Sequence, residues 1–245
     1  KFLYIGVRCY DAEPDQIVRR LSRRDGFDGD WVEFNIDSYH DKRTAFSFTV
    51  TAAGVKGDEF ISNNGSNWDG SWNPIWYTKT RVDDEGWTAE LKIPLSQLKF
   101  SGADDQVWGL QSTRRFFRAE ERSLWQRKPI DQPGWVSEFG ELHGLKKLEP
   151  QKQLEIQPYT VTSAETYEAE EGNPFRDGNE SDLTVGLDAR IGITNDLTLD
   201  LTVNPDFGQV EADPSAIALD GFQIFFREQR PFFVENKNIF DFNIS

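Results

Sequence analysis

Three tryptophans at a spacing of four residues are the side chains of this sequence best suited to binding chemistry. Trp68, Trp72 and Trp76 lie in the segment Asn67-Trp-Asp-Gly-Ser-Trp-Asn-Pro-Ile-Trp76. An indole ring stacks on the apolar C–H face of a sugar ring, while the sugar hydroxyls need planar polar groups nearby. Asn67 and Asp69 supply such groups in the same segment. The pattern predicts a glycan-binding loop, and the alternative is that the rings anchor a hydrophobic core.

Basic side chains elsewhere in the chain are further candidates for the same ligand. Arg24 is predicted to be a polar partner of the stacked sugar. Arg115 and Trp125 belong to a segment in which cations alternate with aromatic residues. Its cations are Arg114, Arg115, Arg118, Arg122, Arg127 and Lys128. Two interpretations stay open for this segment: it grips an acidic polysaccharide, or it pairs with the acidic second part of the chain, which requires no ligand.

An oxygen-rich cluster precedes the first tryptophan-containing strand. Asp25, Asp28 and Asp30 lie within six residues, and hard cations such as Ca²⁺ bind several carboxylate oxygens. Their spacing departs from that of an EF-hand loop, which has a ligand at every second position. The cluster predicts a calcium site. The alternative is an Asp/Gly-rich turn whose carboxylates pair with Arg23 or Arg24.

The sequence offers little catalytic chemistry. His40 and His143 are the two histidines, and neither lies in a zinc-binding or nucleophile-base motif. Glu33, or the pair Glu120 and Glu121, could be imagined as part of a glycosidase couple. Among 42 acidic residues, however, some pair will always look suitable. We therefore predict no catalytic residue and a binding module, at most one attached to a glycan-processing system.

The charge balance excludes some partners. The net charge of -15 argues against nucleic acid, because phosphate binding needs clustered Lys and Arg on one face. Residues 1–150 hold 24 acidic and 21 basic side chains, whereas residues 151–245 hold 18 and 6, so two regions with different surfaces are expected. The single cysteine, Cys9, has apolar neighbours and is predicted to be a small buried hydrophobe.

The elements that must position these side chains are predicted to be β-strands. Short runs rich in β-branched and aromatic residues alternate with Gly, Asp, Asn and Pro. In 31–37, Val32, Phe34 and Ile36 fall on one face, and residues 45–51 and 87–93 alternate in the same way. Further strands are expected at residues 2–10, 72–81, 107–117 and 123–126. The fold class is therefore all-β, an antiparallel, jelly-roll-like β-sandwich.

The residue pattern changes after residue 145, where a polar segment is followed by longer amphipathic runs. We predict a β-sandwich domain over residues 1–145 that lacks its first strands, a linker over 146–152, and a second β-domain over 153–245. Amphipathic runs at 153–162, 182–194 and 197–204 are expected, the last two joined as a hairpin by a tight turn at residues 194–196. A short turn on one side and a long acidic loop at 168–181 on the other is the layout of an outer-membrane barrel, although a soluble meander gives nearly the same pattern.

The first domain resembles a family 9 carbohydrate-binding module in the broad sense. The resemblance is carried by Leu3-Tyr-Ile5 followed by Asp11, by Arg23-Arg-Asp-Gly-Phe-Asp-Gly-Asp-Trp31 leading into Val32-Glu-Phe34, by Gly86-Trp-Thr-Ala-Glu-Leu-Lys-Ile-Pro94, and by Trp108-Gly109 with Arg114-Arg115. It implies a sugar-binding sandwich. Known modules of this family clamp a terminal sugar between two tryptophans, but the cluster at 68–76 does not align with that pair residue by residue.

The second domain is similar to the domain of unknown function 5916. The similarity is carried by Asn204-Pro-Asp-Phe-Gly-Gln-Val-Glu-Ala-Asp-Pro214 and Phe225-Phe-Arg-Glu-Gln-Arg-Pro-Phe-Phe-Val-Glu235. In that family the region follows a module like the first domain and precedes a β-rich remainder thought to be an outer-membrane barrel. The resemblance implies an outer-membrane, periplasmic or cell-surface location in a Gram-negative bacterium, behind a signal peptide that precedes residue 1.

Two functions are favoured at this point, and an intrinsic hydrolase, which would require two carboxylates facing each other across a cleft, is a third alternative. One is a non-catalytic module that binds a poly- or oligosaccharide by aromatic stacking and polar contacts, next to its own C-terminal envelope domain. The other is a structural plug or docking domain of an outer-membrane β-barrel with no sugar ligand. Exposed tryptophan rings would favour the first function, and buried rings would favour the second.

Overall fold

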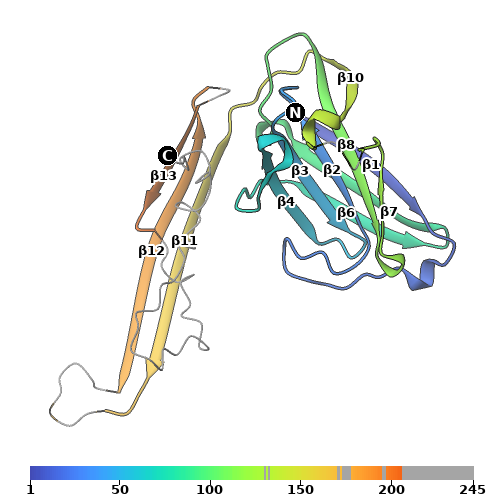
Figure 1. Cartoon of the computed structure of the whole chain (residues 1–245). Coiled ribbons are helices and arrows are strands. Elements are labelled where there is room, and N and C mark those ends of the chain that lie inside the picture. The colour runs from blue at the N-terminus through green and yellow to red at the C-terminus, as the bar shows by residue number, and fades with distance from the viewer. Residues whose placement is uncertain (130, 132, 170–171, 173–177, 195–196, 206–245) are drawn as a thin grey trace. The chain divides into compact units, whose positions relative to one another are not determined.

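The computed structural model describes residues 1–129, 131, 133–169, 172, 178–194 and 197–205 (Figure 1). The chain divides into two compact units, Lys1–Lys152 and Gln153–Ser245, each of which is described by itself. The described residues form β-strands joined by loops and single 3₁₀ turns, without an α-helix. The prediction of an all-β, antiparallel sandwich is confirmed. Among the described residues no helix is long and apolar enough to span a membrane.

The first unit contains two antiparallel sheets. Its strands are β1 (Phe2–Tyr10), β2 (Trp31–Asp37), β3 (Ala45–Thr51), β4 (Lys56–Ser62), β5 (Asn67–Asp69), β6 (Tyr77–Asp83), β7 (Gly86–Pro94), β8 (Asp105–Phe116), β9 (Glu121–Leu124) and β10 (Gly140–Lys146). One sheet has the order β1-β7-β6. The other has the order β10-β8-β2-β3-β4-β5, with β9 also paired to β8. The 3₁₀ turns lie at Pro14–Gln16, Asn63–Gly65, Leu95–Gln97, Phe117–Ala119 and Val136–Glu138.

The core lies between these two sheets. It is formed by the apolar residues that alternate with polar residues along the strands. The even positions of β2 and β3 are buried against the odd positions of β7, because successive side chains of a strand point to opposite faces. Among the most enclosed side chains are Trp87, Trp108 and Phe48. Cys9 of β1 pairs in register with Trp87 and is 2% exposed, and burial raises the pKa of its thiol to about 11. Cys9 is therefore the small buried hydrophobe that was predicted.

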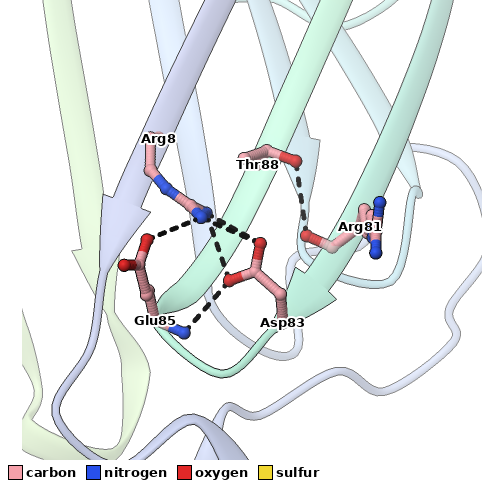
Figure 2. A network of polar contacts seen from close by, with 5 residues as sticks. All are labelled: Arg8, Arg81, Asp83, Glu85 and Thr88. Carbon is pink, nitrogen blue, oxygen red and sulfur yellow. Dashed lines mark hydrogen bonds and ion pairs between the residues drawn. The ribbon is translucent and has the colours of Figure 1, made fainter.

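A polar network closes one end of the three-stranded sheet (Figure 2). The guanidinium of Arg8, on β1, donates to both carboxylate oxygens of Asp83 at 2.9–3.1 Å and to Glu85 at 3.0 Å. Asp83 Oδ1 also accepts the backbone N–H of Glu85 in the β6–β7 turn, and Thr88 Oγ1 bonds the carbonyl of Arg81 at 3.5 Å. Arg8, which is distant in the sequence, thereby holds the turn of the β6–β7 hairpin in place.

The second unit, as far as it is described, is one antiparallel sheet of β11 (Leu154–Thr166), β12 (Asn179–Gly192) and β13 (Thr198–Val203). Its register places apolar side chains together on one face. They are Leu154, Ile156, Leu183, Val185, Leu187, Leu199, Leu201 and Val203, all at least 38% exposed. The opposite face is polar, with Arg190 Nε donating to Asp200 at 2.8 Å and Thr202 Oγ1 to Asp188 at 2.6 Å.

The pairing of β12 with β13 agrees with the predicted hairpin, and Ile193 N–H donates to the carbonyl of Leu197 at 2.9 Å across its end. Asn195 and Asp196 of the predicted turn lie outside the described residues. So do residues 206–214 and the whole segment 225–235, which carry the resemblance to the second family.

Candidate functional site: a tryptophan-lined pocket on the polar face of the large sheet

The face of the seven-stranded sheet that points away from the core is polar and yet buried. Seven of its polar side chains on β2, β3 and β8 are at most 6% exposed: Glu33, Asn35, Ser47, Thr49, Thr51, Gln111 and Thr113. At one end this face is covered by a small second hydrophobic cluster. In that cluster Ala45, Ile61 and Val136 are buried, and Trp68, Trp135 and Phe139 pack against them. A polar layer enclosed in this way is uncommon, because each buried polar group needs a partner.

A pocket of about 250 Å³ opens beside this cluster. It is lined by Asn64, Gly65, Ser66, Trp68, Arg122, Lys128, Gly134 and Trp135. These residues come from three separate places: the 3₁₀ turn Asn63–Gly65 with β5, the segment from β9 to residue 128, and the loop before the 3₁₀ turn Val136–Glu138. The pocket therefore exists only once the sheet has brought these segments together.

The two tryptophans of the pocket are held by their ring nitrogens. The centroids of Trp68 and Trp135 lie 6.2 Å apart with an interplanar angle of 47°. Trp68 Nε1 donates to the carbonyl of Gly65 at 2.9 Å, and Trp135 Nε1 donates to Asn35 Oδ1 at 2.7 Å. Both rings are partly buried. Since their N–H groups are already bonded within the protein, a ligand would meet the rings by stacking.

Asn64 joins the two loops that carry these tryptophans. Its Oδ1 accepts the backbone N–H groups of Trp135 and Ser137 at 3.1 and 2.9 Å, and its Nδ2 donates to Ser137 Oγ at 3.0 Å. Asn64 has a φ of 55°, a left-handed conformation that Asn tolerates better than most residues. Gly65 follows with a φ of 91°, and a Cβ there would lie 2.4 Å from Trp135 Cβ. Glycine is therefore required at position 65.

Arg122 contacts two aromatic rings near the polar face. Its guanidinium carbon is 5.6 Å from the ring centroid of Trp31 and 5.7 Å from that of Trp135, within the range of a cation–π contact. The same guanidinium is 3.7 Å from Oε1 of Glu33, an ion-pair contact too long for a hydrogen bond. Arg122 thus partly compensates the charge of a buried carboxylate while half of its own side chain stays exposed, at 48%.

Oε1 of Glu33, the oxygen nearest to Arg122, is buried and has no hydrogen-bond partner among the described residues. Burial raises the pKa of Glu33, and Arg122 opposes that rise. Glu59, on β4, also has a raised pKa, of about 7, because of burial and of the neighbouring carboxylates of Glu33 and Asp25. Glu33 and Glu59 on this face of the sheet therefore bind protons more readily than ordinary glutamates.

The structure separates the three tryptophans predicted from their spacing. Trp68 lines the pocket, whereas Trp72 packs on Phe46 and Phe48 with centroid distances of 5.1 and 5.5 Å. Trp76 is 1% exposed, and its Nε1 donates to Asp58 Oδ2 at 3.1 Å. Trp76 has no free face for a sugar, so its assignment to a ligand site was wrong. The chain turns after β5, and the later rings reach the core instead of the polar face.

The polar partners predicted beside these tryptophans have structural contacts. Asn67 Nδ2 donates to Ser62 Oγ at 3.1 Å, and Asp69 Oδ1 accepts from the backbone N–H and Oγ of Ser71 at 2.9 and 2.6 Å. Arg24 donates to Asp58 at 2.6 and 2.9 Å and to the carbonyl of Pro74 at 3.1 Å. None of the three lines the pocket. These contacts hold the segment 62–74, which contains β5, in place. Asn67, Asp69 and Arg24 therefore stabilise the segment that carries Trp68 and do not line the pocket.

The basic segment is divided between structure and pocket. Arg115 donates to the carbonyl of Glu120 at 2.7 Å, and Arg118 makes two 2.6 Å bonds to the buried Asp11. Trp125 is 57% exposed, and its ring lies against Gly140, where a Cβ would be 2.6 Å away. Neither Arg115 nor Trp125 lines the pocket, but Arg122 and Lys128 of the same segment do.

The predicted calcium cluster is not assembled. Asp30 accepts the backbone N–H of Val18 at 2.9 Å, Asp28 pairs with Arg20 at 3.0 Å, and Asp25 accepts the N–H of Asp58 at 3.1 Å. Within the described part of the chain no group of three or more His, Cys, Asp or Glu side chains could hold a metal ion. The three carboxylates have separate partners, which are Val18, Arg20 and Asp58 and not the Arg23 or Arg24 of the alternative interpretation.

Trp135 is the aromatic pocket residue that sequence reasoning missed. It follows Pro133 and Gly134 in a loop without alternation, so no strand pattern assigned it to a face. An aromatic residue in a Pro/Gly loop is the signal that could have found it, because loops held on a rigid sheet often carry binding residues.

Comparison with known proteins gives one family match. Residues 150–243 match the domain of unknown function DUF5916. The match covers the second unit, where the sequence resemblance predicted it. The likeness of the first unit to family 9 carbohydrate-binding modules and the barrel expected for the second stay predictions.

Among solved structures, the chain is similar to the crystal structure of a "putative carbohydrate-binding protein" from Bacteroides uniformis ATCC 8492. The identity is 16% and the TM-score 0.44, over 58% of this chain and 72% of that chain. No curated protein matches the sequence.

Proposed function

We propose that the first unit is a glycan-binding module whose ligand enters the pocket between Trp68 and Trp135. The observation that carries the proposal is the pocket itself, in which two indole rings lie beside two cationic side chains on the polar face of a rigid sheet. Sugars combine an apolar ring face with a polar rim, and such a pocket offers surfaces for both. A volume of about 250 Å³ suits a single sugar unit or the end of a chain, since pockets for drug-sized ligands begin at about 300 Å³.

Isothermal titration calorimetry against plant, host and cell-wall oligosaccharides tests the proposal. For a glycan that binds, Trp68→Ala should weaken the affinity roughly tenfold, the equivalent of about 1.4 kcal/mol. Ser66→Phe is the second variant, because residue 66 is exposed at the lip of the pocket and has ordinary αR backbone geometry. It should block entry without removing any packed ring.

Tyr4→Ala is the matched control, since Tyr4 is 67% exposed on the other sheet. The proposal fails if no oligosaccharide binds, or if binding is unaffected by both Trp68→Ala and Ser66→Phe. The first result would favour the second function, a plug or docking domain without a sugar ligand.

For the second unit we propose a place in the bacterial cell envelope, with the apolar face of β11–β13 against a non-aqueous environment such as an outer membrane. Eight apolar side chains on one sheet face, each at least 38% exposed, support this. Such a face is unfavourable in water and marks a membrane or protein contact. Fractionation of the bacterium that makes the protein, with an antibody to the intact chain, is the test. Recovery in the cytoplasmic fraction would refute the proposal.

A further inference from the structure

The pocket carries positive charge without a carboxylate among its lining residues. Its two ionisable lining side chains are Arg122 and Lys128, and the others are Asn, Gly, Ser and Trp. The chain as a whole has a net charge of -15, so a cationic pocket is a local exception to its overall field. A pocket that received only neutral sugar hydroxyls would be expected to offer hydrogen-bond acceptors as well as donors.

The acceptors of this pocket are already used within the protein. Asn64 Oδ1 accepts two backbone N–H groups, and the carbonyl of Asn64 accepts that of Trp135 at 2.9 Å. The carbonyl of Gly65 accepts Trp68 Nε1. Ser66 Oγ, which is donor and acceptor at once, is a remaining hydroxyl at the pocket lip. The lining therefore has few acceptors left for a hydroxyl that must donate.

The donors of the two cations, in contrast, make no hydrogen bond to another described residue. Lys128 makes no hydrogen bond or ion pair with another described residue. Arg122 has the 3.7 Å contact to Glu33 and its two ring contacts, but no hydrogen bond within the described part of the chain. An ammonium has three N–H donors and a guanidinium has five in a planar fork, which matches a carboxylate. A ligand rich in acceptors would satisfy both groups.

From this imbalance we infer that the pocket selects an acidic sugar, with the carboxylate of a uronic acid between Arg122 and Lys128 and its ring stacked on Trp68 or Trp135. The inference rests on the proposed glycan function and adds the class of ligand. A guanidinium and an ammonium both bind a carboxylate through charge-assisted hydrogen bonds, which are about twice as strong as neutral ones. Arg122 is suited to this role because contacts with the Trp31 and Trp135 rings hold its guanidinium beside the pocket.

Calorimetry with the whole chain and a matched pair of ligands tests the inference: an oligogalacturonate and its fully methyl-esterified form, which differ in charge. The acid should bind at least roughly tenfold more tightly than the ester. Lys128→Gln should remove most of that difference and leave the affinity for the ester within about twofold. Lys79→Gln, on β6 of the other sheet, is the control and should change neither affinity. Raising the salt concentration should weaken the binding of the acid and leave the binding of the ester unchanged.

The outcomes separate the inference from the function on which it rests. If the acid and the ester bind equally and Trp68→Ala weakens both, the pocket takes neutral sugars, and the inference is wrong while the proposed function stands. If neither these ligands nor any other glycan binds, both are wrong. A sulfated oligosaccharide that binds more tightly than the uronate, and depends on Lys128, would overturn the carboxylate assignment.

Discussion

Trp135 Nε1 donates a hydrogen bond of 2.7 Å to Oδ1 of Asn35, a residue 100 positions earlier in the chain. Asn35 is fully buried on β2, and its Nδ2 donates to Ser47 Oγ at 3.2 Å. A side chain of the sheet floor thereby orients one wall of the pocket. The polar face of the sheet therefore helps to determine the conformation of the loop that carries Trp135.

We expect Asn35→Ala to loosen that wall. The substitution leaves the indole N–H of Trp135 without its acceptor and should reduce the free energy of unfolding by about 1–3 kcal/mol. Denaturant unfolding and the tryptophan emission spectrum measure the effect. Ser47→Ala is the matched control, because it removes the other partner of Asn35 and leaves the indole bond intact. Equal spectral shifts in both variants would contradict the orienting role.

Replacement of Trp76 should affect stability and not ligand binding. Trp76→Phe removes the bond to Asp58 and leaves a small cavity in the core, so we expect a loss of about 1–3 kcal/mol in the free energy of unfolding. Affinity for any bound glycan should stay within about twofold, since Trp76 is 1% exposed. A loss of affinity at temperatures where the variant is fully folded would restore Trp76 to the binding site.

The ion pair of Asp11 and Arg118 should protect the sandwich at neutral pH. The hydrogen bonds from Arg118 lower the pKa of Asp11 below its ordinary value of 3.8, against the effect of burial. A lowered folded-state pKa means that the stabilisation is present above pH 3.8 and is lost as the pH falls through the folded pKa. Asp11→Asn should therefore be less stable than the native chain at pH 7, and the gap should close in acid. Asp15→Asn, at an exposed position, should show no such gap.

Glu59 should have the opposite pH dependence. Burial, and then Glu33 and Asp25, raise its pKa from 4.5 to about 7. A carboxyl group with a raised folded-state pKa gives its full stabilisation below pH 4.5 and loses it as the pH rises through about 7. Glu59→Gln, which stays neutral, should be more stable than the native chain at pH 8, on the order of 1–2 kcal/mol, and the difference should fall toward zero below pH 4.5.

Carboxyl titration followed by NMR checks the same group directly, since the Glu59 signal should shift near pH 7 and disappear in Glu59→Gln. Glu90→Gln, on the three-stranded sheet, is the control and should leave the stability difference between pH 5 and pH 8 unchanged. A Glu59 signal that titrates at an ordinary pH would show that the carboxyl is more hydrated than the structure indicates.

The fold was predictable where alternation was regular. Strands β2, β3 and β7 have apolar residues at every second position, and their inward faces were read correctly. Strand β4 was missed because Gly57, Asp58 and Glu59 at its centre break the pattern. A cross-strand partner, the inner strand β3, decides this pairing, and local sequence does not contain it.

The site was predictable only in part, and for a physical reason. A spacing of four residues does not say which side of a sheet each ring reaches once the chain turns, so Trp68, Trp72 and Trp76 could not be separated. The partner of Trp68 is Trp135, from a distant loop, and their contact depends on bonds made by Asn64 and Asn35. Such long-range contacts arise from the assembled sheet and leave no mark in a local motif.

The enclosed thiol of Cys9 gives the molecule a built-in reporter. Because the chain has one cysteine and its side chain is buried in the core between the two sheets, a maleimide or disulfide reagent can reach the sulfur only when the sheets separate. The rate of modification under native conditions therefore measures how often the two sheets separate, without denaturant and without an added label. Saturating ligand should slow that reaction in proportion to how strongly it favours the closed form.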